Sequence, residues 1–155
     1  MIQKKDSSKV FIIGTFFLLI IIFLAVAIIY EKNKKENNRI IKINLDTNVE
    51  ETLNWAFSTK TNFIDAKIGQ IYKIDFNVEN YSSEVTSGRA IYEVKPEFLK
   101  KYFVEIDCFC YKKQILSPSE KSKYSITFYI DPKIINDLKA VDIRDINISY
   151  TFLNT

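Results

Sequence analysis

The sequence predicts an all-β domain, built as a β-sandwich, that follows a single N-terminal transmembrane helix. Three observations support this prediction. The first is a run of 21 uncharged residues at positions 10–30. The second is an alternation of apolar and polar residues in several short segments after position 39. The third is that no long helical segment separates these short runs, as is typical of two packed antiparallel sheets.

The uncharged run, VFIIGTFFLLIIIFLAVAIIY, has the length of a membrane-spanning helix. As a helix it is roughly 31 Å long, about the thickness of the hydrocarbon core of a bilayer. A cleaved signal peptide is the alternative, because Ala25-Val26-Ala27 has the pattern of a cleavage site. The apolar run continues through Tyr30 and exceeds the roughly 7–15 residues of a signal-peptide core. We therefore expect a retained anchor at 10–30 that contacts the lipid bilayer.

The charges beside this run define a short N-terminal tail at 1–9 and a polar linker at 31–39. Three lysines precede the run, and three lysines and Arg39 follow it, so the positive-inside rule leaves the orientation open. The remaining residues, 40–155, carry fifteen basic and sixteen acidic side chains. A nucleic-acid-binding domain would carry a basic patch, so we expect no nucleic-acid partner.

Alternation with a period of two marks the strands of the domain at 40–155. Each alternating segment has one apolar and one polar face, as half-buried strands do. Short helical turns are expected where Asp131 precedes Pro132 and where Pro96 precedes Glu97, because proline fits the first turn of a helix. The predicted strands are 40–45, 72–79, 90–94, 104–110, 124–130 and 146–152.

The chain contains no histidine, which excludes histidine-based acid–base catalysis, Ser-His-Asp triads and zinc sites that need histidine. Its two cysteines lie close together in Asp107-Cys108-Phe109-Cys110-Tyr111. Four interpretations of this pair are open: two small buried apolar side chains, a disulfide, a redox pair, or two ligands of one metal ion.

Strand geometry, the charge of neighbouring residues and the available ligands make some of these four interpretations less favourable than others. Cys108 and Cys110 on a strand would share a face, with Cα atoms about 6.6 Å apart, near the upper limit for a disulfide. Redox catalysis is disfavoured because the pair does not begin a helix and Asp107 would raise the thiol pKa. Zinc usually takes four protein ligands, or three plus water, and this chain has no other cysteine and no histidine to complete such a site. Two thiolates suit Cu(I) better, either two-coordinate or shared in a dimer. From these five residues alone, buried apolar cysteines remain the simplest interpretation.

The surrounding residues change this balance. The segment YFVEIDCFCYKKQILSPSEKSKYSITFYIDP at 102–132, with SYTF at 149–152, resembles the CtaG/Cox11 family of cytochrome c oxidase assembly proteins. The matching positions are Tyr102-Phe103, Cys108-Phe109-Cys110-Tyr111, Gln114, Leu116, Pro118, Glu120, Phe128, Asp131-Pro132 and Ser149-Tyr150-Thr151-Phe152, and upstream Trp55-Ala56-Phe57, Asn80, Gly88 and Val94-Lys95-Pro96.

This resemblance implies a membrane-anchored immunoglobulin-like β-sandwich that carries copper and is not an enzyme. The implied ligands of Cu(I) are Cys108 and Cys110, and the implied recipient is the CuB site of cytochrome c oxidase subunit I. The copper-loaded form would be a homodimer. The domain would lie on the periplasmic side of a bacterial inner membrane, or face the intermembrane space on the mitochondrial inner membrane. Because copper transfer needs a reachable site, we expect an exposed cysteine pair at a domain edge. The alternative is a membrane-tethered scaffold with structural cysteines.

The chain departs from the resembled pattern at four places, one of which is the family's usual methionine, replaced around Tyr124. The family's third cysteine, just after the membrane helix, is absent from YEKNKKENNRI at 30–40. Glu105 replaces a lysine before the cysteines, and Ser119 replaces the glycine after Pro118. None of these changes removes a predicted copper ligand. The residues around the cysteine pair carry more negative charge than in the resembled pattern, and the third thiol is missing.

Overall fold

The computed structural model describes residues 6–37 and 39–155, which form two compact units, one N-terminal and one from Arg39 to Thr155. The N-terminal unit is one long helix, α1 (Asp6–Asn37). The segment Phe11–Lys32 is apolar and long enough to cross a membrane, and none of it is buried within the protein. A helix that is apolar on all sides is typical of a membrane span. α1 is therefore a candidate membrane anchor.

The helix differs from the predicted boundaries at both ends. Of the predicted tail at 1–9, residues 6–9 are helical and residues 1–5 lie outside the described residues. The predicted polar linker at 31–39 is helical as far as Asn37. Glutamate and lysine are good helix formers, and extending an existing helix requires no new nucleus. A charged segment can therefore continue the helix.

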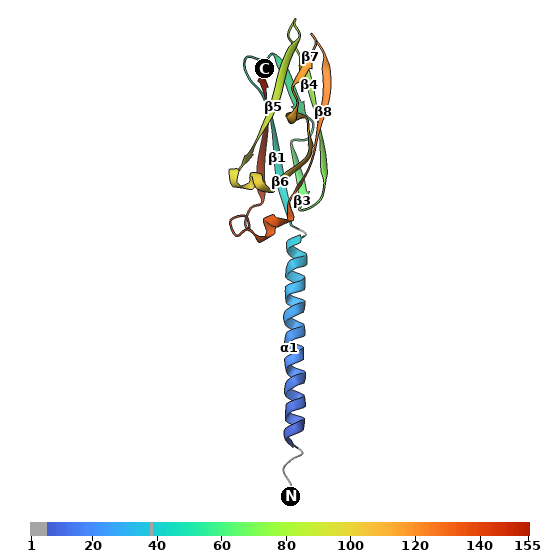
Figure 1. Cartoon of the computed structure of the whole chain (residues 1–155), viewed down its shortest axis with the longest axis vertical. Coiled ribbons are helices and arrows are strands. Elements are labelled where there is room, and N and C mark those ends of the chain that lie inside the picture. The colour runs from blue at the N-terminus through green and yellow to red at the C-terminus, as the bar shows by residue number, and fades with distance from the viewer. Residues whose placement is uncertain (1–5, 38) are drawn as a thin grey trace. The chain divides into compact units, whose positions relative to one another are not determined.

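The second unit is a two-layer β-sandwich, which confirms the predicted all-β fold (Figure 1). One sheet has the strand order β3-β1-β9-β5-β7, and the other has the order β2-β4-β8-β6. β1 and β9 pair in parallel, and the other neighbours pair antiparallel. The strands are β1 (Ile40–Val49), β2 (Trp55–Thr59), β3 (Phe63–Lys67), β4 (Tyr72–Asn80), β5 (Thr86–Lys95), β6 (Phe103–Cys108), β7 (Gln114–Leu116), β8 (Lys121–Ile130) and β9 (Asp145–Asn154).

All six predicted strands are present, and so are both predicted helical turns, as the 3-10 helices η1 (Glu97–Tyr102) and η3 (Pro132–Asn136). The prediction missed β2, β3 and β7, which are only three to five residues long. Segments this short contain too few alternations to show a period. The predicted strand at 104–110 ends early, at Cys108.

The core of the sandwich lies between its two sheets and belongs to the domain alone. Its buried apolar side chains all fall between Ile41 and Phe152. The largest fully buried members include Tyr150, Phe76 and Phe128. Because the domain has its own apolar core, a fragment covering residues 39–155 is suitable for measurements of stability.

One carboxylate ties the loop after η3 to η1. Asp137 accepts hydrogen bonds from the Tyr102 hydroxyl at 2.6 Å, from the Lys139 amide at 2.9 Å and from the Lys101 ammonium at 3.0 Å. These donors, the Tyr102 hydroxyl first, lower the pKa of Asp137 to about 2. The ionised form is favoured in the folded state, so this contact stabilises the domain above the usual aspartate pKa.

Replacing Asp137 with asparagine is expected to destabilise the domain at pH 6. The difference in unfolding free energy between wild type and variant should become smaller as the pH falls. In the wild type, ionised Asp137 contributes its full stabilisation of the domain above pH 3.8, and this stabilisation is lost as the pH falls through about 2. Urea unfolding of the 39–155 fragment between pH 2 and 6 measures this difference. Asp65→Asn, at an exposed position on β3, is the control. An Asp137→Asn effect that stays constant with pH would contradict the assignment.

Candidate metal centre

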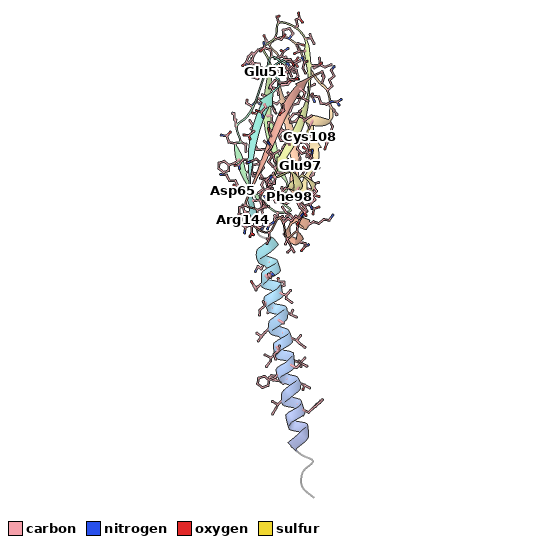
Figure 2. All side chains as sticks on the ribbon, turned by 90° about the vertical axis from the view of Figure 1, so that its left-hand side faces the viewer. Glu51, Asp65, Glu97, Phe98, Cys108 and Arg144 are labelled. Carbon is pink, nitrogen blue, oxygen red and sulfur yellow. A yellow bond between two sulfur atoms is a disulfide. The ribbon has the colours of Figure 1, made fainter. Side chains whose placement is uncertain are left out.

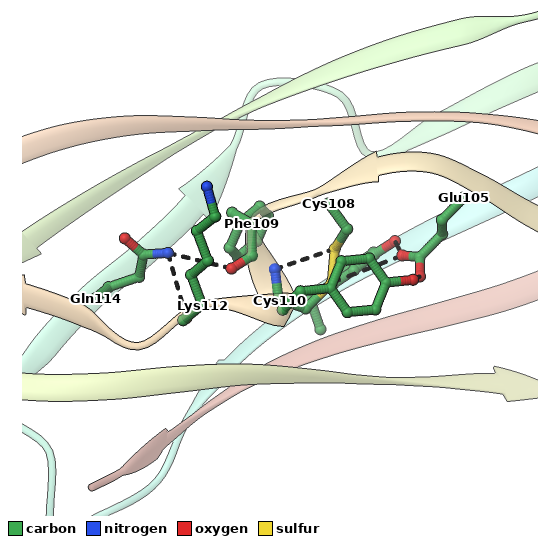
Figure 3. Close-up of a disulfide and its surroundings, with 8 residues drawn as sticks. Glu105, Cys108, Phe109, Cys110, Lys112 and Gln114 are labelled. Atoms are coloured by element: carbon green, nitrogen blue, oxygen red, sulfur yellow. Dashed lines mark hydrogen bonds between the residues drawn. A yellow bond between two sulfur atoms is a disulfide. The ribbon is translucent and has the colours of Figure 1, made fainter.

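The two cysteines lie where the chain crosses from one sheet to the other. β6 is an edge strand of the four-stranded sheet, and β7 is an edge strand of the five-stranded sheet. The 3-10 turn η2 (Phe109–Tyr111) connects them, with Cys108 at the end of β6 and Cys110 in the turn (Figure 3). The predicted continuous strand through Cys110 is therefore wrong, because the chain must leave its sheet here.

Local hydrogen bonds fix this turn. The Cys110 amide donates to the sulfur of Cys108 at 3.2 Å. The side-chain amide of Gln114 donates to the carbonyl oxygens of Phe109, at 3.1 Å, and Lys112, at 3.3 Å (Figure 3). Gln114 thus satisfies backbone acceptors that the sheets do not reach.

Phe109, between the cysteines, anchors the turn in the core. Its ring stacks on Tyr124 at 5.4 Å and on Phe152 at 5.7 Å between centroids. It also meets Phe76 at 5.5 Å and Phe57 at 6.0 Å. These four partners come from both sheets, so the Phe109 ring packs between the two layers of the sandwich.

Cys108 and Cys110 form a disulfide in the structure (Figure 3). Strand geometry predicted about 6.6 Å between their Cα atoms, whereas the turn reduces this distance to 5.2 Å, within the usual disulfide range. The cysteines are also buried, with exposed fractions of 5% and 8%, which corrects the expectation of an exposed pair. A bridge across one residue closes almost no loop, so it adds little stability through chain entropy.

A bulge in β6 brings a carboxylate to the cysteines. The register with β8 shifts between Glu105 and Asp107, which leaves Ile106 as an extra, exposed residue. The shift lets Glu105, three residues before Cys108, lie half-buried on the same side as that cysteine. Alternation alone would have placed them on opposite faces. An isoleucine at a solvent-facing strand position was the only sequence signal for this bulge.

Tyrosines surround the Glu105 carboxylate. It accepts hydrogen bonds from the hydroxyls of Tyr111 at 3.0 Å and Tyr150 at 3.2 Å. Burial raises the pKa of Glu105, and the tyrosine hydrogen bonds oppose this shift. Burial and the nearby carboxylate raise the pKa of Tyr92 to about 12 and also raise the pKa of Tyr150. The tyrosines therefore remain protonated donors at neutral pH.

The structure brings both predicted ligands together and adds a third donor. The ligand atoms of Glu105, Cys108 and Cys110 lie within 4.8 Å of one another, so this group could hold a metal ion. The sulfur of Cys110 lies 3.7 Å from a Glu105 oxygen. In the disulfide this sulfur has no hydrogen to donate, whereas a reduced Cys110 thiol would donate to the carboxylate. Two soft sulfurs beside one hard oxygen favour a thiophilic ion once the bridge is reduced.

The fold and this site define a class: a β-sandwich with a candidate membrane anchor and a two-cysteine centre at the crossing between its sheets. The family model of the cytochrome c oxidase assembly protein CtaG/Cox11 matches residues 24–154. This chain belongs to that family.

Curated relatives named cytochrome c oxidase assembly protein CtaG support this assignment. The protein from Nitrobacter hamburgensis is 34% identical over 74% of this chain and 53% of its own length. The protein from Ehrlichia ruminantium is 38% identical over 72% of this chain and 63% of its own length. The chain thus matches roughly half to three-fifths of these relatives. Among solved structures, a PapD-like domain of human CEP192 shares 11% identity at a TM-score of 0.30, over 77% of this chain and 87% of that one, too low to support an argument.

Proposed function

We propose that this chain is a membrane-anchored Cu(I) carrier that supplies copper to the CuB site of cytochrome c oxidase subunit I during oxidase assembly. The observation that supports this proposal best is the pairing of Cys108 and Cys110 at the crossing between the sheets, with Cα atoms 5.2 Å apart. Two thiolates so close can bind one soft ion. Membership of an oxidase assembly family supports the recipient.

Copper loading begins with reduction of the disulfide. A dithiol reductant supplies two electrons and two protons, which convert the bridge into two thiols while the reductant becomes a disulfide. Cu(I) then binds the two sulfurs and displaces their protons. Release is a ligand exchange, in which an acceptor ligand bonds to copper as one thiolate leaves. Copper stays Cu(I) throughout, so the protein acts as a carrier and not as an enzyme.

Glu105 and the aromatic residues set the surroundings of the bound ion. The carboxylate adds negative charge beside a copper–bis-thiolate group that is already anionic. As a hard oxygen donor it binds a soft ion less strongly than the sulfurs do, so the two thiolates remain the main copper ligands. Phe109 holds the backbone of the turn, so the two cysteines stay close together when the bridge opens and their sulfurs move apart to admit an ion.

Anaerobic titration of the full chain with Cu(I) tests this proposal. We expect tight binding by the reduced protein, and none by the disulfide form or by a variant with both Cys108→Ser and Cys110→Ser. The matched control is Ser58→Ala, at an exposed position on β2, the edge strand opposite β6 in the four-stranded sheet, which should bind as the wild type does. Unchanged binding by the double variant would reject the cysteines as ligands.

The remaining parts of the proposal concern location and partners. The α1 helix is retained in the bilayer, with the domain on the periplasmic side of a bacterial inner membrane or facing the mitochondrial intermembrane space. The copper-loaded form is a homodimer that docks on oxidase subunit I. The long C-terminal domain can be translocated regardless of its charge, which agrees with this orientation. Labelling of exposed domain lysines from each side of sealed vesicles determines the side.

One observation favours a second function, that of a membrane-tethered scaffold with structural cysteines. Both cysteines are buried, with exposed fractions of 5% and 8%. A scaffold would keep its reduced thiols shielded and would bind no copper. Alkylation of the reduced, folded protein separates the two functions, because the carrier must expose its thiols and the scaffold does not.

A further inference from the structure

Exposed apolar side chains gather at the end of the domain where the chain arrives from α1. Two loops form this end: the turn at 68–71 and the loop at 137–144, called the base loops below. Leu138 is 88% exposed and Ile71 is 60% exposed. Val141 and Ile40 are also exposed. Single exposed leucines are ordinary on protein surfaces, so the inference depends on where this group lies.

Arg39, the first residue of the domain, connects both base loops. Its backbone carbonyl accepts from the Ile68 amide at 3.3 Å. Its guanidinium donates to the carbonyls of Ala140, at 3.2 Å, and Val141, at 2.9 Å. The base loops therefore lie at the point where the chain enters the domain. Figure 2 shows Arg144 and Asp65 at this end of the domain and Glu51 at the opposite end.

The length of the connecting chain keeps this end near the bilayer. The candidate span ends at Lys32, seven residues before Arg39. Seven residues cover about 10 Å as a helix and at most about 25 Å when fully extended. The headgroup region alone adds roughly 5–8 Å on each side of the hydrocarbon core. No other part of the domain is tied so closely to the membrane by its covalent connection.

The loop that carries Leu138 is fixed in shape. The Ala140 amide donates to the Asp137 carbonyl at 2.8 Å, and the Lys139 amide donates to the Asp137 side chain at 2.9 Å. Ala140 is fully buried, so the loop is pinned to the core while Leu138 points outward. A fixed loop can insert an apolar side chain into lipid without losing much conformational entropy.

The charges of this end indicate an apolar rather than an electrostatic contact. The segment 131–145 carries four acidic and three basic side chains, and Arg39 and Lys101, which contact it, bring the basic side chains to five. One of its acids, Asp137, is paired with Lys101, and another, Asp131, with Lys133. A nearly balanced surface gains little from anionic lipid headgroups. Burial of leucine, isoleucine and valine in the interface supplies the favourable free energy.

We propose that the base loops rest on the lipid surface of the bilayer that holds α1, with Leu138 and Ile71 inserted at the level of the headgroups and upper acyl chains. This contact fixes the orientation of the domain on the membrane, because two loops and the covalent tether define a plane. The proposal needs α1 as an anchor and does not depend on copper binding.

Depth-dependent fluorescence quenching in vesicles tests this contact. The full chain is reconstituted in phosphatidylcholine vesicles with or without brominated acyl chains, as Leu138→Trp and, separately, Ile71→Trp. Val85→Trp is the matched control: it is exposed, and its loop lies at the opposite end, where the Tyr81 amide donates to the Asn54 carbonyl at 2.8 Å. The signal of buried Trp55, whose indole donates to the Thr86 hydroxyl next to position 85, is measured in the unmutated chain in both kinds of vesicle.

We expect brominated lipid to reduce the added fluorescence at positions 138 and 71 at least twofold and to leave position 85 unchanged. The quenching should persist in zwitterionic lipid and at high salt. Absence of quenching at both base positions, or equal quenching at all three, would overturn the proposal. Quenching that requires anionic lipid and disappears with salt would replace apolar insertion with an electrostatic contact. The copper titration is unaffected by any of these results, so the two proposals fail separately.

Discussion

Replacing Phe109 with alanine is expected to destabilise the domain by about 3–5 kcal/mol, the usual range for a buried phenylalanine. The ring is buried and touches aromatic side chains of both sheets, including Tyr124 and Phe152. Its removal leaves a cavity at the crossing between the sheets that rigid neighbouring rings cannot fill. Urea unfolding of the 39–155 fragment measures the change, and Phe98→Ala, at a partly exposed ring, provides the control with a smaller loss.

The same substitution should also weaken copper binding under the proposed function. The Phe109 ring packs the turn that holds Cys108 and Cys110 against both sheets, so its loss lets the two cysteines move apart. Phe109→Leu keeps most of the volume and should retain more of both stability and affinity. A destabilised Phe109→Ala domain that still binds Cu(I) as the wild type does would show that the turn needs no anchor. A stability loss below about 1 kcal/mol would contradict the packing argument.

Replacing Asn80 with alanine is expected to destabilise the domain by about 2–4 kcal/mol, because buried acceptors lose their donor. Asn80 is fully buried, and its amide nitrogen donates to the carbonyls of Glu84, Leu116 and Ser117 at 2.9–3.1 Å. Its side-chain oxygen accepts from the Ser82 amide at 2.9 Å. One side chain thus joins the β4–β5 loop to the end of β7.

Asn80→Asp is the sharper version of this test. Aspartate has nearly the same shape but cannot donate when ionised, and it faces three carbonyl oxygens. We expect Asn80→Asp to be more destabilising than Asn80→Ala at neutral pH and to recover partly in acid. Asn48→Ala, which removes one exposed hydrogen bond to Ser149, should change the unfolding free energy by less than about 1 kcal/mol. Equal effects at positions 80 and 48 would contradict the assigned role.

Many residues that carry the family resemblance have structural roles in the fold. Gln114 holds the turn after the cysteines, and Glu120 accepts from the Ser117 amide at 2.7 Å. Asp131 caps η3 by accepting from the Lys133 amide at 2.9 Å. Ser119, which replaces the glycine of the resembled pattern, has a φ of 60°, in the left-handed region that favours glycine. Several residues of the pattern around the cysteines therefore shape the turns of the sandwich.

Long alternating segments were predictable because their periodicity is local. The strands β4, β8 and β9 each show at least four apolar positions at a spacing of two, and all three are present in the structure. The short strands β2, β3 and β7 show no such period. They exist because longer neighbours offer an edge with which to pair, which is information that the short segments do not contain.

The sequence by itself determined the apolar helix, the strand-rich domain, the family, and the identity of Cys108 and Cys110 as a close pair. Tertiary structure alone decided that the chain turns between the sheets after Cys108, that both cysteines are buried and joined, and that Glu105 lies beside them. The physical reason is the same at each point. Periodicity and composition are properties of neighbouring residues, whereas a bulge, a crossing between sheets and the gathering of Leu138 and Ile71 at one end depend on contacts between segments far apart in the chain.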